Sequence, residues 1–170
     1  MTAPHAMMSA SAPQPPAGAG PAAPEASEEM TVETRFGPLT CTPQAVIDMP
    51  QGGPLGFAQH RRFALLDLPN PQLARFRLLQ SLADPELSFV VVPTDRDGGL
   101  IAPKDVDEAC AAAGIQPADA VILLIVTVRR TPKGTTMTAN LRAPVMLDVK
   151  RRTARQIVLS NPDYPIQHAL

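Results

Sequence analysis

The side chains that most resemble a catalytic set are Ser81, His60 and Asp84. A serine nucleophile needs a histidine within hydrogen-bonding reach and a carboxylate that orients the histidine. The G-x-S-x-G sequence that often surrounds an activated serine is absent from the chain. Residues of these three types occur in most proteins of this size, so they give no support for hydrolysis. We therefore predict that the protein is not an enzyme.

Metal and phosphate sites need clustered donors, and the sequence does not supply them. The histidines, His5, His60 and His168, are far apart, and Cys41 and Cys110 have no C-x-x-C spacing. The glycines between residues 52 and 56 lack both the spacing and the lysine of a P-loop. We predict that no cofactor is bound, and we expect both cysteines to be reduced and buried.

The strongest charge feature is a basic cluster, Lys150, Arg151, Arg152 and Arg155. Clustered guanidinium groups attract phosphates, so one interpretation is direct RNA binding. The other is a solvated hairpin turn whose charges oppose edge-to-edge aggregation. Because no aromatic side chains interleave to stack on bases, we favour the turn and expect no direct nucleic-acid binding. RNA binding through residues 150–155 remains the alternative function.

Short β-strands must position most of these residues. Residues 31–37 alternate, with Phe36 on the same face as Val32, and the Gly37-Pro38 turn leads into a second strand, 39–42. Three consecutive antiparallel strands are predicted at 62–68, 75–82 and 87–93, and a last hairpin encloses residues 150–153. The β-branched run 120–128 should be the central strand, followed by a hairpin loop at 132–136. A single helix is predicted over 102–115, with Pro103 near its start and Gly114 at its end.

This pattern of eight or nine short strands and one helix predicts a mainly β fold. We expect a small barrel-like antiparallel β domain with one short α-helix insertion. In the strand at 75–82, alternation places Gln80 on the apolar face. Pro144 requires an extended entry to the following strand, so residues 137–145, MTANLRAPV, are predicted to form an irregular bridge.

The first 29 residues differ in composition from the rest of the chain. They contain no Val, Ile, Leu or aromatic residue and are rich in Pro and Ala, so we predict a disordered Pro/Ala-rich N-terminal tail over 1–29 and a folded domain over 30–170. All 15 Lys and Arg residues and 13 of the 16 acidic residues follow residue 29, which gives the domain a charge of +2. Since no secretory signal or membrane-length apolar run is present, we expect no membrane association and a cytoplasmic location.

Four segments, in order along residues 30–170, resemble the flagellar assembly factor FliW family. They are VETRFG, LLQSLADPELSFVVV, VTV followed by MTANLRAPV, and QIVLSNPDYPIQHAL. The resemblance implies a compact barrel-like fold without a cofactor. It also implies a non-enzymatic regulator that binds the RNA-binding translational regulator CsrA and relieves its repression of flagellin translation, with flagellin as the competing partner. Members of this family commonly begin near the position of Met30, so residues 1–29 are either an extension or a misassigned start.

The matched segments also imply where partners bind. We predict partner contacts at six residues: Gln80, Ser81, Asn140, Arg142, Tyr164 and His168. Gln80 and Asn140 are the leading candidates, because amides on apolar segments need hydrogen-bond partners when they are buried. A structural hydrogen bond and a contact to a partner are open alternatives for both. We expect the protein alone to be monomeric. Its domain charge of +2 departs from the family, whose members tend to be acidic.

Overall fold

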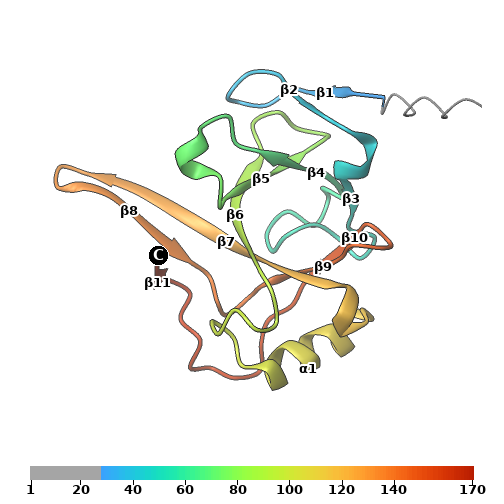
Figure 1. Cartoon of the computed structure of the whole chain (residues 1–170), viewed down its shortest axis with the longest axis vertical. Helices are drawn as coiled ribbons and strands as arrows, with labels where there is room; N and C mark the ends of the chain where they lie inside the picture. Colours follow the sequence, from blue (N-terminus) through green and yellow to red (C-terminus); the bar gives the residue numbers. More distant parts are fainter. Residues whose placement is uncertain (1–27) are drawn as a thin grey trace, which may run out of the picture.

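The computed structural model describes residues 28–170 (Figure 1). The tail predicted at 1–29 therefore lies outside the described residues, apart from Glu28 and Glu29.

Within the described residues, seven strands close into a ring. β7 pairs with β6 on one side and with β9 on the other, so the sheet meets itself in the order β7-β6-β5-β4-β3-β10-β9. All neighbours are antiparallel except β3 and β10, which pair in parallel at Asp48 and Thr153. The predicted barrel-like β fold is confirmed, with one parallel seam. The strands are β3 Val46–Asp48, β4 Arg62–Asp67, β5 Arg77–Ser81, β6 Ser88–Thr94, β7 Ala120–Thr131, β9 Val145–Asp148 and β10 Thr153–Gln156.

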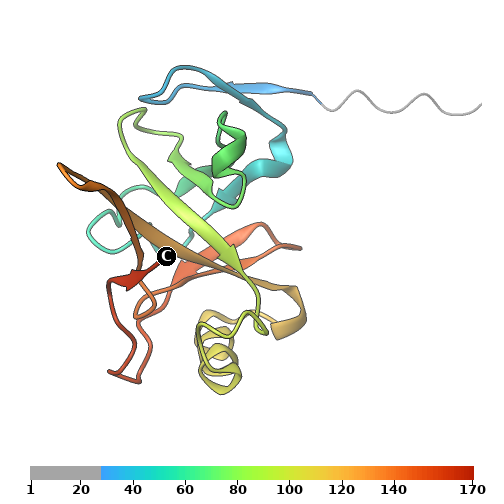
Figure 2. The same ribbon diagram turned by 60° about the vertical axis from the view of Figure 1, so that its left-hand side comes forward.

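β7 is longer than the ring requires, and its second half forms an arm with β8 (Gly134–Ala139). Figures 1 and 2 show this arm extending away from the ring. The sequence analysis predicted a hairpin loop at 132–136 and an irregular bridge at 137–145. That prediction was wrong for residues 134–139, which form a strand, and only residues 140–144 are irregular. Gly134, at φ 128, and a hydrogen bond from Thr131 Oγ1 to the Gly134 carbonyl (2.9 Å) make a tight turn that lets pairing resume. A short final strand, β11 (His168–Ala169), pairs with the outer edge of β8.

The hairpin predicted from its turn chemistry is present, formed by β1 (Met30–Val32) and β2 (Leu39–Cys41). It is a two-stranded sheet separate from the ring. Val32 buries its side chain against a cluster that includes Leu66 and Leu78 of the ring. The predicted alternation fails at Phe36, which is 57% exposed. Thr34 is the cause, since its hydroxyl donates to the Gly37 carbonyl (2.7 Å) and accepts from the Phe36 N–H (3.0 Å), which ends the strand early.

The core fills the ring and extends under α1 (Pro103–Ala113). Inside the ring, the fully buried side chains include Ile47, Met49, Phe63, Leu123 and Val145. α1 packs Val106, Ala109 and Cys110 against Ile122 and Leu124 of β7. It begins with Pro103 and ends at Gly114, whose left-handed φ of 72 confirms the predicted stop. Of the two cysteines, which are not bonded to each other, Cys110 is buried as expected but Cys41 is half-buried.

Candidate protein-binding surface

Gln80 is fully buried near the end of β5. Its Nε2 donates towards four backbone carbonyls and lies 2.9 Å from Asp84 O and 3.0 Å from Leu87 O. The surrounding carbonyls fix the orientation of the amide, because only its NH₂ end can donate to them. Gln80 Oε1 is buried without a hydrogen-bond partner among the described residues. The side chain therefore secures the turn at 82–87 from inside and reaches the surface only through that backbone.

Ser81 and His60 are brought together, but not as a catalytic pair. Ser81 Oγ lies 3.0 Å from His60 Nδ1 and also accepts a hydrogen bond from the Ala83 N–H (3.2 Å). The serine is 1% exposed, and its hydroxyl is engaged in these two contacts. The Asp84 carboxylate accepts from the Glu86 N–H instead of orienting the histidine. The contact joins the glycine-rich loop before β4 to the end of β5.

Asn140 turns the chain from β8 towards β9. Its Oδ1 accepts hydrogen bonds from the N–H groups of Arg142 (2.9 Å) and Ala143 (3.1 Å). Its own N–H donates to the Ile125 carbonyl on β7 (2.9 Å). This is the turn chemistry expected of an asparagine side chain that replaces a backbone acceptor. Arg142 is half-buried beside it, with its Nε buried and lacking a hydrogen-bond partner among the described residues.

Tyr164 fastens the C-terminal strap, residues 157–170, to the start of α1. Its hydroxyl donates to Asp105 Oδ2 (2.6 Å) and accepts from the Ala102 N–H (2.9 Å). Burial of the phenol and the hydrogen bond to Asp105 raise the pKa of Tyr164 above its ordinary value. The strap then passes Asn140, where the Leu141 N–H donates to the Pro165 carbonyl (3.0 Å), and reaches β8, where His168 pairs with Ala139.

Four of the six predicted contact residues therefore lie along one path, where the strap crosses the end of β8. They are Asn140, Arg142, Tyr164 and His168. Gln80 and Ser81 lie at the turn between β5 and β6 instead.

The basic cluster closes the C-terminal end of α1. Arg155 Nη1 donates to the Ala112 carbonyl (2.8 Å), and Arg151 Nη1 donates to the Gly114 carbonyl (3.3 Å). Lys150 Nζ lies 2.8 Å from Asp119 Oδ1, a hydrogen bond that raises the pKa of Lys150. Cations at the negative end of a helix are favourable, so these side chains stabilise the fold locally.

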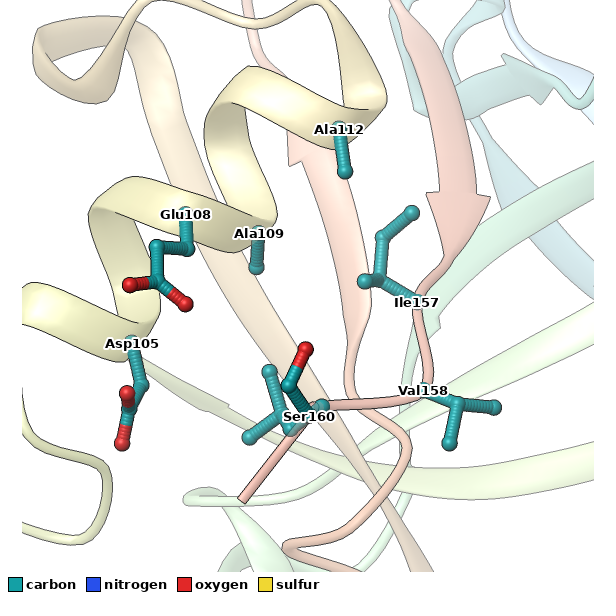
Figure 3. A pocket seen from close by; sticks show the side chains of 8 residues that line it. Asp105, Glu108, Ala109, Ala112, Ile157, Val158 and Ser160 are labelled. Atoms are coloured by element: carbon teal, nitrogen blue, oxygen red, sulfur yellow. The ribbon is translucent and has the colours of Figure 1, made fainter.

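A small cavity lies between α1 and the strap (Figure 3). Its volume is about 80 Å³, which is room for only a few water molecules. The carboxylates at its α1 side are already engaged, Asp105 by Tyr164 and Glu108 by Lys104. Over residues 28–170, no group of three His, Cys, Asp or Glu residues is placed to hold a metal ion. The same residues contain no helix long and apolar enough to cross a membrane.

Over residues 28–170, sequence reasoning also missed an open groove of about 520 Å³, which is much larger than this cavity. Three elements form its walls: the tip of the β1–β2 hairpin, the turn around the 3₁₀ helix Pro71–Leu73, and the β7–β8 arm. We call it the apolar groove, after its mostly apolar lining. Its lining residues are Arg35, Phe36, Leu68, Pro69, Asn70, Leu73, Phe76, Val90, Val128, Arg130, Thr135 and Met137.

Local geometry explains why these side chains meet. On the arm, Val128 pairs with Met137 and Arg130 pairs with Thr135, so all four point to one face. Asn70 Oδ1 accepts from the Gln72 N–H (3.0 Å), which starts the 3₁₀ helix and brings Leu73 to the groove. Exposure of Phe36 (57%) and Val128 (43%) leaves a continuous apolar surface. An exposed patch of this kind marks an interaction site more often than a single exposed residue does.

Comparison with known proteins identifies similar chains. The profile of the family described as "FliW protein" matches residues 30–170. The flagellar assembly factor FliW of Geobacter sulfurreducens is 38% identical over 136 residues, which cover 79% of this chain and 82% of the relative. That of Bdellovibrio bacteriovorus is 35% identical over 144 residues, covering 81% and 76%. A crystal structure of the flagellar assembly factor FliW superimposes with a TM-score of 0.63 at 26% identity, covering 82% of this chain and 96% of that one.

Proposed function

The chain belongs to the FliW family, and on this premise we propose that it regulates flagellar assembly by binding the translational regulator CsrA and flagellin as competing partners. It acts in the cytoplasm, without catalysing a reaction and without a cofactor. The protein alone is monomeric, and each partner binds to the folded domain at 30–170.

The observation that carries the proposal is the apolar groove. Its lining combines aromatic and aliphatic side chains from three separate elements, of which Phe36 and Val128 are well exposed. Burying such a surface against a partner releases water from it, at roughly 25 cal/mol per Å² of apolar area. Ser81, the nucleophile of the catalytic set considered from the sequence, is in contrast buried and accepts a hydrogen bond from the Ala83 N–H. The surface is therefore suited to protein binding.

Competition between two partners is enough to make a regulator. A limited amount of this protein divides between CsrA and flagellin according to their free concentrations and affinities. When flagellin accumulates it occupies the protein, and CsrA is released to repress translation. The scheme needs no conformational change, only overlapping contacts.

Calorimetric titration with CsrA and flagellin from the same bacterium tests the proposal. We expect a Kd of about 10 µM or tighter for each partner. Prior saturation with flagellin should weaken the apparent affinity for CsrA. Absence of measurable binding to either partner at tens of micromolar would contradict the proposal.

A matched pair of variants tests the groove in the same assay. Val128→Ser should weaken binding of at least one partner severalfold without lowering the melting temperature, because Val128 is exposed on the arm. Val158→Ser is the control, since Val158 is 55% exposed and lies on the strap, away from the groove lining. If the two substitutions weakened binding equally, the apolar groove would not be the surface that binds the partners.

Direct RNA binding through residues 150–155 gains little support from the structure. Lys150, Arg151 and Arg155 already contact Asp119, Asp148 and the end of α1. Phosphates would have to compete with these contacts.

A further inference from the structure

We propose that the apolar groove recognises a segment of a partner protein in which apolar side chains are flanked by carboxylates. The inference rests on the proposed function in one respect, namely that the groove binds protein. It adds the chemistry of the segment, which family membership does not give.

The rim of the groove carries three arginines that have no ion-pair partner among the described residues. Arg35 and Arg130 are part of its lining, and Arg75 is next to Phe76, which also lines it. All three side chains are exposed, and none has an ion pair or a side-chain hydrogen bond within the described residues. The lining contains no acidic residue. The nearest carboxylate in sequence, Asp67 beside Leu68, is already paired with Arg77 at 2.9 Å.

Of the basic side chains outside the rim, some are neutralised by ion pairs, whereas others, such as Arg61 and Arg129, have none among the described residues. Carboxylates within 4 Å partner six of the basic side chains: Arg62, Arg77, Arg96, Lys104, Lys150 and Arg151. A bound carboxylate would therefore gain more from the rim of the groove than from these six. Charge complementarity of this kind steers association and selects among partners.

Two of the rim arginines are held against the aromatic rings of the groove. The guanidinium carbon of Arg35 lies 4.8 Å from the centre of the Phe36 ring, and that of Arg75 lies 4.6 Å from the Phe76 ring. Stacking of this kind restrains a long side chain before a partner arrives. A segment that covers Phe36 with an apolar side chain would place its next polar group near the Arg35 guanidinium. Apolar and acidic contacts are thus available at adjacent points.

The lining favours a peptide segment over a nucleic acid. Leu68, Leu73, Val90, Val128 and Met137 make the walls and floor aliphatic. A phosphate backbone in the groove would bury its charges against these side chains, which is unfavourable. A segment with a row of aliphatic side chains fills the same space without that penalty, as an amphipathic helix does in a hydrophobic groove.

Two fluorescein-labelled helical peptides provide the test. They share one leucine face and differ only in the residues that flank it, glutamates in one and lysines in the other. Fluorescence anisotropy with the full chain should show at least tenfold tighter binding of the acidic peptide. The preference should shrink as salt is raised, because the arginines are exposed.

Charge reversal on the groove supplies the decisive comparison. The double variant Arg35→Glu and Arg130→Glu should prefer the lysine peptide. The matched control, Arg129→Glu with Lys133→Glu, makes the same change in net charge outside the groove lining, since Arg129 is on the opposite face of β7 from Arg130. The control should keep the wild-type preference. Melting temperatures should stay close to that of the wild type for both.

Several outcomes would overturn the inference. These are equal binding of the two peptides, an equal shift in the control variant, tighter binding of single-stranded RNA than of the acidic peptide, or self-association of the chain that the acidic peptide does not disrupt. If neither peptide binds while CsrA and flagellin do, the partners use another surface and the proposed function survives. If the acidic peptide binds and neither protein does, the inference survives and the proposed function fails.

Discussion

At the scale of single residues, the two amides expected to meet a partner are both bonded to the backbone around them. Gln80 holds the turn after β5, and Asn140 holds the turn after β8. Apolar neighbours in the sequence indicated that these amides would need hydrogen-bond partners. The sequence could not indicate whether those hydrogen-bond partners would be backbone groups of this chain or groups of a binding protein. The answer depends on how the chain folds back at 84–87 and at 142–143.

Asn140→Ala should lower the free energy of unfolding by about 1–2 kcal/mol, because two partly buried N–H groups lose their acceptor. Binding of CsrA and flagellin by the folded variant should be unchanged. Denaturant unfolding and calorimetry measure the two effects. Asn140→Asp is the control, since it keeps an acceptor oxygen and should be destabilised less. Weakened binding at unchanged stability would show instead that Asn140 contacts a partner.

Tyr164→Phe should change how stability depends on pH. The pKa of Tyr164 is raised in the folded protein, so the neutral hydroxyl stabilises the fold below about pH 10, its ordinary pKa. That contribution is lost as the pH rises through the raised pKa. We therefore expect the wild type to be more stable than the variant at pH 7, and the difference to shrink above pH 10.

Chemical unfolding of both proteins at a series of pH values gives this difference directly. Tyr164 is the single tyrosine of the chain, and the titrating groups that both proteins share cancel in the comparison. A difference that stays constant to pH 11 would mean that burial and the hydrogen bond to Asp105 do not favour the neutral hydroxyl in the folded protein.

At the scale of elements, the link between the β9–β10 turn and α1 explains the basic cluster. Arg151 and Arg155 come from the turn and from β10, yet they bond to carbonyls at the end of α1. The sequence predicted both the helix and the hairpin, each from its own local pattern. It could not pair them, because nothing in residues 150–155 specifies which distant carbonyls the guanidinium groups will reach.

Arg155→Ala should lower the free energy of unfolding by about 1 kcal/mol through loss of its bond to Ala112 O. Hydrogen exchange should increase most in the last turn of α1. Arg61→Ala is the matched control, because Arg61 is exposed and its side chain makes no hydrogen bond or ion pair with another described residue. The same two variants also test the RNA-binding alternative. We expect neither substitution to change how strongly the protein is retained by an RNA column. Loss of RNA affinity in the Arg155 variant alone would revive the RNA-binding alternative.

Elements of regular length were predictable and very short ones were not. The three strands β4 to β6 follow from apolar runs separated by turn-forming segments. β11 has two residues, too few to show a period, and depends on the free edge of β8 for its existence. The apolar groove needs residues from 35 to 137 to meet, and its one local signal is the apolar side chain of Phe36 beside a turn.

At the scale of the whole molecule, the ring has one weak seam. β3 and β10 share a single pair of residues in parallel, whereas β6 and β7 share five in antiparallel register. Opening the seam would release fewer backbone hydrogen bonds than opening the opposite side of the ring. Local opening with a low free energy is expected at such a place.

Native-state hydrogen exchange should show this asymmetry. The Asp48 N–H, which donates to the Arg152 carbonyl across the seam, should exchange through a smaller opening free energy than the amides of residues 122–126 on β7. Mass spectrometry of peptic fragments or NMR can report both regions in one sample. Equal protection of the two regions would mean that the ring opens only by global unfolding.

The position of Tyr164 also has an optical consequence. The chain has one tyrosine and no tryptophan, so its near-ultraviolet emission comes mainly from a ring that joins the C-terminal strap to α1. A phenol hydrogen-bonded to a carboxylate emits weakly, and detachment of the strap should brighten it. Tryptophan emission in any mixture belongs to the partner alone. The unlabelled protein can therefore report on its strap and on an incoming tryptophan-containing partner in the same cuvette.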